Sequence, residues 1–167
     1  MNHFLRLVDG LNTWIGRTVG WVMIFIMLVT VYDVVARRLF NAPVLWAFDV
    51  SVQLFALHFM IVAAYTLLHK EHVSIYIFKE RLSVRNQALL DILSFLIFFF
   101  PFVIALLVYG WEFAARSWAS RETSWGAVAL PVYYIKTVIP VTAALLILQG
   151  ICTMIRLVDT VRTGEAK

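Results

Sequence analysis

Residues 37–49 of the chain, RRLFNAPVLWAFD, connect two long apolar segments. The Asn41-Ala42-Pro43 sequence in the middle of this connection predicts a turn. A proline disfavours the helical conformation for the residue before it, so Ala42 is expected to lie outside both flanking helices. Pro43 can begin the second helix, because the first turn of a helix does not use that N–H group. The stretch therefore predicts a tight reversal between two helices.

Two charged residues inside the apolar segments, Asp49 and Lys136, are the main candidates for a role there. Asp49 is expected two turns inside the second helix, and Lys136 about five residues into the last apolar segment. Charged groups at such depths need partners, so we predict a role for Asp49 in function or subunit assembly. Asp49 and Lys136 can pair with each other, reach the membrane surface separately, or belong to a proton or ion relay.

The composition of the chain is that of a membrane protein. Of its 167 residues, 62% are hydrophobic and 14% are charged, whereas a soluble domain is about half apolar and about a quarter charged. A chain this short cannot bury so much apolar surface in one aqueous core. We therefore predict an all-α integral membrane protein surrounded by lipids. Its net charge of +4 indicates no nucleic-acid partner, because basic residues commonly flank membrane spans.

Four apolar segments are long enough to cross a hydrocarbon core of about 30 Å. Within a single membrane domain formed by residues 1–167, they cover approximately residues 18–36, 44–68, 87–110 and 131–155. Pro101 should kink the third span, and Pro131 is expected in the first turn of the fourth. Between these spans we expect a short helix over Trp111–Ala119, followed by a loop.

Residues 3–15 alternate apolar and polar side chains with helical spacing, and the segment is too polar to span a membrane. Two interpretations are open. The segment is either an amphipathic helix that lies in the membrane interface, or a leader that extends the first span.

The distribution of cations predicts the orientation of the spans. Nine Lys and Arg residues lie near the termini or between the second and third spans, whereas four lie in the other two connections. Because the richer side of a multi-pass protein faces the cytoplasm, both termini are predicted to be cytoplasmic. Tryptophans at the opposite ends of the spans fit an interfacial aromatic belt.

No residue pattern predicts an enzyme, a metal site or a cofactor. His69 and His72 are three residues apart but lack a third ligand. His58 is the only histidine deep in a span, and a bis-histidine haem would need a second histidine from another chain. A hydrogen bond that packs helices together is the favoured interpretation of His58, and likewise of Gln53 and Gln149. The chain also lacks the internal repeats typical of complete transporters, so a partner protein is predicted.

Short motifs recur in a definite order around the four spans. They are Arg38-Leu39-Phe40-Asn41-Ala42-Pro43 with Trp46 and Asp49, His72-Val73 with Ile75, Ser124-Trp125, Leu130-Pro131, Lys136, Ile139-Pro140 and Leu148-Gln149-Gly150. In this order and spacing they resemble the small membrane subunit (DctQ type) of tripartite ATP-independent periplasmic (TRAP) transporters. Asp49 departs from the family pattern, in which glutamate is common at this place.

The resemblance implies a scaffold subunit without catalytic function, in the inner membrane of a bacterium. Its partners would be a large membrane subunit, which imports an organic anion with sodium ions, and a periplasmic substrate-binding protein. Roles at a subunit interface or in the fold are implied for Arg38, Asn41, Pro43, Trp46, Asp49, Lys136 and Gln149. A docking rim for the binding protein is implied at Arg116, Arg121 and Glu122. The alternative hypothesis is a membrane anchor or haem-bearing subunit of a redox complex.

Overall fold

The computed structural model describes residues 2–126 and 128–163, apart from the segment 70–82. Four helical stretches in these residues are long and apolar enough to cross a membrane, as predicted. The third stretch comprises two α-helices joined by a π-helical turn. In chain order the elements are α1 (Asn2–Leu39), α2 (Ala47–Leu68), α4 (Val84–Ser94), the π-helix η1 (Phe95–Phe99), α5 (Phe100–Ser120) and α6 (Tyr133–Thr163).

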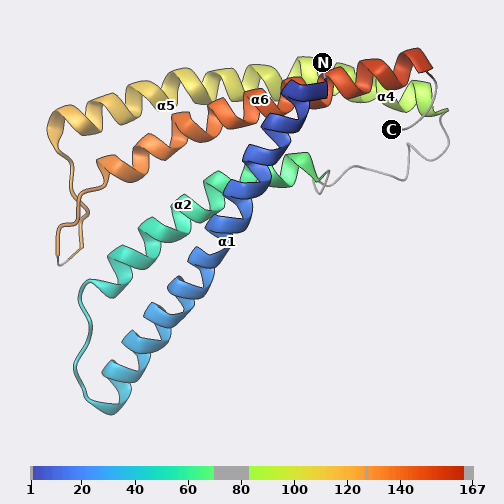
Figure 1. Cartoon of the computed structure of the whole chain (residues 1–167). Coiled ribbons are helices and arrows are strands. Elements are labelled where there is room, and N and C mark those ends of the chain that lie inside the picture. The colour runs from blue at the N-terminus through green and yellow to red at the C-terminus, as the bar shows by residue number, and fades with distance from the viewer. Residues whose placement is uncertain (1, 70–82, 127, 164–167) are drawn as a thin grey trace.

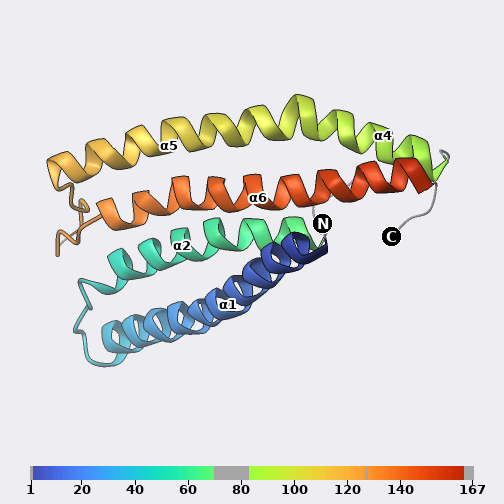
Figure 2. The same ribbon diagram turned by 45° about the horizontal axis from the view of Figure 1, so that its top comes forward.

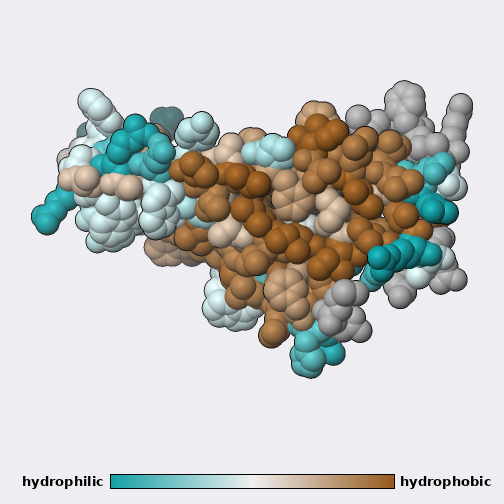
Figure 3. All heavy atoms as spheres, turned by 90° about the horizontal axis from the view of Figure 1, so that it is seen from above, coloured by the Kyte–Doolittle hydropathy of each residue, from teal (hydrophilic) through white to brown (hydrophobic). Residues whose placement is uncertain are grey.

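The helices form an open layer, in the order α1, α2, α6 and then α4 with α5 (Figures 1 and 2). The N-terminus, the end of α6 and the start of α4 lie toward one end of this layer. The connections 40–46 and 121–132 lie at the other, which we call the turn end. Figure 3 shows hydrophobic residues over the middle of the molecule and polar residues toward both ends, as a membrane-spanning protein requires.

The central helix α6 carries most of the core. Its residues Ala143 and Leu146 pack with Ala64 and Leu67 of α2 and with Val103 of α5. Glycines permit this close approach, because a Cβ atom at Gly110 would lie 2.6 Å from the Ile139 side chain of α6. Small residues at the contacts are typical of helices that pack within membranes.

Pro101 bends the third span as predicted, and the π-helix η1 shows how. The ring of a helical proline clashes with the carbonyl four residues earlier and leaves it without a donor. The turn before Pro101 is widened, so that the Phe100 N–H donates to the Phe95 carbonyl, five residues back. The direction of the span changes between α4 and α5 in Figure 2.

The structure does not confirm a separate amphipathic helix at residues 3–15. Helix α1 continues without a break from Asn2 to Leu39, as the alternative of an extended first span predicted. Part of its polar face finds partners on α6, where Asn12 Nδ2 donates to Gln149 Oε1 at 2.7 Å. Asp9 accepts from Gln149 Nε2 at 3.3 Å and pairs with Arg156.

Three predicted helix boundaries are wrong. Helix α2 begins at Ala47, so Pro43 lies outside it and Asp49 occupies its first turn. The cause is a long-range contact, because the Val44 N–H donates to Asp33 Oδ1 at 3.1 Å and keeps this segment in the connection. Residues 111–119 belong to the continuous α5 and form no separate helix. Helix α6 begins after Pro131, because Pro131 forms an isolated β-bridge with Thr123.

Candidate functional site at the turn end

The turn end brings together most of the residues predicted for interfaces. Arg38, Asn41, Pro43, Trp46 and Asp49 lie in or beside the 40–46 connection, and Arg116, Arg121, Glu122 and Lys136 lie in or beside the 121–132 loop. Gln149 lies apart from them, in the contact between α6 and the N-terminal part of α1. The hydrogen bond with Asn12 agrees with the predicted packing role of Gln149.

Asn41 closes the end of α1. Its backbone is left-handed, with φ of 50°, a conformation that asparagine tolerates better than most residues. The following N–H, of Ala42, then donates to the Ala36 carbonyl at 3.2 Å. Asp33 supports the same turn through Val44 and pairs with Arg37 at 2.7 Å, as expected from their four-residue spacing.

An open groove of about 650 Å³ lies beside this turn. Its lining is mainly apolar and comes from the end of α1, from the 40–46 connection, including Pro43 and Trp46, and from Val128 of the loop. Arg38 is exposed at the same end of α1. The groove can therefore receive an apolar group near a cation.

Asp49 is buried, with 7% of its surface exposed, and lies directly against the loop. A Cβ atom at Gly126 would be only 1.8 Å from Asp49 Oδ2, so a residue with a side chain cannot fit there without movement. No hydrogen bond to Oδ2 is present within the part of the chain that the structure describes. The carboxylate thus faces the loop backbone, and the sequence analysis did not identify Gly126 as its neighbour.

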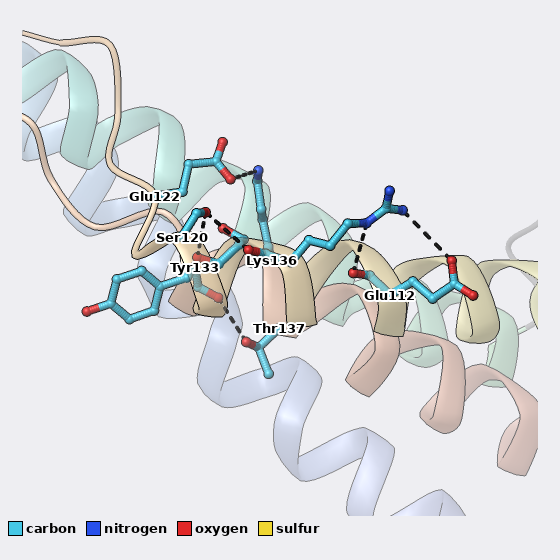
Figure 4. Close-up of polar contacts among 8 residues, drawn as sticks. Glu112, Ser120, Glu122, Tyr133, Lys136 and Thr137 are labelled. Atoms are coloured by element: carbon cyan, nitrogen blue, oxygen red, sulfur yellow. Dashed lines mark hydrogen bonds and ion pairs between the residues drawn. The ribbon is translucent and has the colours of Figure 1, made fainter.

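Lys136 pairs with Glu122 and not with Asp49. Its Nζ atom donates to Glu122 Oε2 at 2.5 Å and lies 4.0 Å from the centre of the Phe113 ring. Figure 4 shows the two charged side chains pointing toward each other. Hydrogen bonding from Lys136 lowers the pKa of the Glu122 carboxyl below its ordinary value of 4.5. The pair of Lys136 with Asp49, which was one of the alternatives, is therefore absent from the structure.

The 121–132 loop is a hydrogen-bonded hairpin. Val132 N–H donates to the Glu122 carbonyl at 3.0 Å, and Ser124 N–H donates to the Leu130 carbonyl at 2.7 Å. The Ser124 hydroxyl accepts from the Leu130 N–H at 3.1 Å. Trp125 lies at the tip and is fully exposed. These contacts pair residues 122–124 with residues 130–132.

The remaining polar residues near this end contact other residues of the chain or end a helix. Trp118 Nε1 donates to Thr137 Oγ1 at 2.8 Å and joins α5 to α6. Arg116, predicted for the docking rim, lies over Glu112 one turn earlier, with 3.8 Å between their charged atoms. Arg121 ends α5 with a left-handed backbone and is exposed.

The histidines do not converge on a site in the described residues. His58 Nδ1 lies 3.1 Å from the Val19 carbonyl of α1, which is the helix-packing contact predicted for it. His69 contacts the Tyr65 carbonyl of its own helix at 3.0 Å. The predicted partner of His69, His72, lies outside the described residues.

Most of the chain matches the model of a known protein family. A family model described as "Tripartite ATP-independent periplasmic transporters, DctQ component" matches residues 26–160, from the middle of α1 to the last turns of α6. No curated protein matches the chain. The match includes the 40–46 connection and the 121–132 loop.

Proposed function

Because the chain belongs to the DctQ family of tripartite ATP-independent periplasmic transporters, we propose that it is the non-catalytic scaffold subunit of a sodium-driven importer of an organic anion. A large membrane subunit moves the anion, and this chain supports that subunit without moving the anion itself. A soluble periplasmic protein captures the anion and docks at the turn end. Both termini lie in the cytoplasm of a bacterium.

The open helical layer is the observation that carries the scaffold proposal. In the most apolar window of α6, 39% of the residues are buried within the structure, but the other three spans reach only 6–11%. Lipid or another membrane protein must cover the remainder. A layer one helix thick offers a broad face to a larger subunit, whereas a closed bundle would offer only a narrow one.

One face of α6 has the spacing expected for contact with another helix. The exposed side chains along it are three, four or seven residues apart, at Val141, Ala144, Leu148, Ile151 and Val158. The stripe includes a small residue and carries no charge, as is common where membrane helices meet. Packing and a few interhelical hydrogen bonds of about 0.6–2 kcal/mol each are enough to hold such subunits together. We propose this stripe as part of the contact with the large subunit.

The cationic groups of the turn end support the proposed docking role. Glu122 and Arg116 of the predicted rim each have a charged partner within the chain. Arg38 and Arg121 are exposed and form no ion pair within the segments that the structure describes. Within the docking surface, these two arginines are therefore the groups available to an acidic partner.

Purification of the tagged chain from its native host in mild detergent tests the scaffold proposal. We expect mass spectrometry to identify a large multi-span partner, and an absorbance scan to show no haem band. Recovery of redox subunits with a haem band would instead support the redox-complex hypothesis. A chain that is recovered without any large membrane protein would contradict the scaffold proposal.

A further inference from the structure

Trp125 is the most exposed aromatic residue in the described part of the chain. Its whole indole lies outside the fold, at the tip of the hairpin. The other tryptophans near it have contacts within the chain, because Trp118 bonds to Thr137 and Trp46 lines the groove. Exposed tryptophans that insert into a partner's pocket often carry a large share of the binding energy at protein interfaces.

Backbone hydrogen bonds join the two arms of the hairpin that carries Trp125. Its hydrogen bonds join Glu122 to Val132 and Ser124 to Leu130, on both sides of the tip. A flexible loop would lose conformational freedom when it bound a partner, and this loss would weaken the complex. A preformed hairpin avoids most of that loss.

Two carboxylates lie where the hairpin approaches different helices. Glu122 joins its base to Lys136 of α6. Asp49, in the first turn of α2, lies against Gly126 next to the tip. Asp49 is more than nine-tenths buried, and its Oδ2 atom has no hydrogen bond in the described residues, so it is directed at the loop backbone. The ion pair joins the base of the hairpin to α6, and the close approach of Asp49 leaves Gly126 little room to move toward α2.

The surroundings of Trp125 favour a protein partner in water. The base of its hairpin carries the charged residues Arg121 and Glu122, and Ser124 precedes it. The apolar groove reaches the same hairpin through Val128. Arg38 and Arg121 add exposed positive charge at this end. The complementary surface has an apolar pocket for the indole, with carboxylates around it.

We propose that the 121–132 hairpin is a preformed docking element for the soluble periplasmic component, with Trp125 as its anchor and Asp49 as the residue that positions it. The inference rests on the proposed function, in which the turn end faces the periplasm. Beyond that function, the inference names the residue that contacts the partner and the buried carboxylate that positions this residue.

Binding of the purified periplasmic component to the complete membrane complex in lipid nanodiscs tests the anchor. We expect Trp125→Ala to weaken binding by about tenfold or more. Trp111→Ala is the matched control, because Trp111 is also largely exposed but lies on the apolar surface of α5. Its binding should equal that of the wild type. Equal affinity for the Trp125→Ala complex would overturn the proposal.

The same preparation separates this inference from the proposed function. If the large subunit co-purifies with wild type and Trp125→Ala alike, the scaffold proposal stands whatever the binding result. If no large subunit co-purifies with the wild type, the scaffold proposal is contradicted, independently of any result for Trp125→Ala.

A double-mutant cycle tests the positioning role of Asp49. Asp49→Asn keeps the size of the side chain but removes its charge, and we expect it to weaken binding of the periplasmic component. In a Trp125→Ala background the same substitution should cause little further loss, because both act through one anchor. Fully additive losses of affinity would show that Asp49 does not act through Trp125.

Thiol labelling distinguishes a docking element from a membrane-surface anchor. Val128→Cys places a thiol in the exposed part of the hairpin, while the natural Cys152 is buried. A membrane-impermeant maleimide should label Val128→Cys in nanodiscs, and the bound periplasmic component should protect it. A thiol that the reagent cannot reach, because the hairpin lies in lipid, would overturn the proposal.

Discussion

At the scale of single residues, two of the charged groups near the membrane boundary, Lys136 and Asp33, have partners within the chain. Lys136 contacts Glu122 and Phe113, and Asp33 contacts Arg37 and a backbone N–H. Asp49 instead faces backbone at Gly126. The sequence showed which of these groups need partners, but a pair that joins a helix to a distant loop depends on a fold that local patterns do not specify.

Gly126→Ala should destabilise the protein. The new methyl group would overlap Asp49 Oδ2, so the hairpin or the first turn of α2 must move. We expect a lower melting temperature in detergent. Gly10→Ala is the control, because nothing lies within 4 Å of the added atom, and alanine favours a helix by up to about 1 kcal/mol over glycine. A melting temperature for Gly126→Ala at or above that of the wild type would contradict the contact.

The Glu122 carboxyl predicts a pH dependence of stability. Because its pKa is lower in the folded state, its stabilising effect is present at neutral pH and is lost as the pH falls below 4.5 and through the folded value. We expect Glu122→Gln to lower the melting temperature at neutral pH and to make the acid-induced decrease smaller. Melting curves of both proteins from about pH 7 to about pH 3 measure this difference. Identical pH profiles would exclude a stabilising ion pair with Lys136.

At the scale of elements, hydropathy predicted the four spans because the signal for each is contained in its own sequence. The bend at Pro101 was predictable for the same reason. The start of α2 was not, because it depends on Asp33, eleven residues before Val44. The direction of the polar face of α1 depends on Gln149, 137 residues after Asn12, so no local pattern indicates it.

Asn12→Ala should weaken the contact between α1 and α6. It leaves the buried Gln149 amide without its donor, and the cost of such a loss is about 1–3 kcal/mol. We expect a lower melting temperature and faster proteolysis near the N-terminus. Thr13→Ala is a neighbouring control outside this hydrogen bond. The double mutant Asn12→Leu with Gln149→Leu lacks both polar groups. Its decrease in melting temperature should be smaller than the sum of the decreases in the two single mutants.

At the scale of the whole molecule, the two ends of the helical layer differ. The start of α1 and the end of α6 lie toward one end, and the connections 40–46 and 121–132 lie at the other. The apolar surfaces between them are left for lipid or a partner. The lack of internal repeats predicted that a partner is needed, whereas the stripe on α6 became identifiable only when the neighbours of α6 were known.

Ala144→Trp should disrupt assembly but not the fold. Ala144 is exposed on the proposed contact stripe, so an indole there would hold the large subunit away. We expect less large subunit to co-purify, with an unchanged melting temperature of this chain alone. Val108→Trp, at an exposed position of α5, is the control. Normal assembly of Ala144→Trp would place the contact on another face.

The orientation of the layer can be measured with single cysteines. In cells with a permeable outer membrane, an impermeant maleimide should label Val128→Cys at the turn end. It should label Arg162→Cys only after the inner membrane is opened. The reverse pattern would show that the termini face the periplasm.

The contact of Asn12 with Gln149 also sets an order of events during synthesis. Asn12 leaves the ribosome 137 residues before its partner, which at about 5–20 residues per second is an interval of roughly 7 to 27 seconds. Throughout that interval Asp9 and Asn12 have no α6 to bond to, and only water or lipid headgroups can serve them. The polar groups of the first helix can therefore pair only when the last helix arrives, and a nascent chain that stalls after α5 would expose this polar face to the cell's quality control.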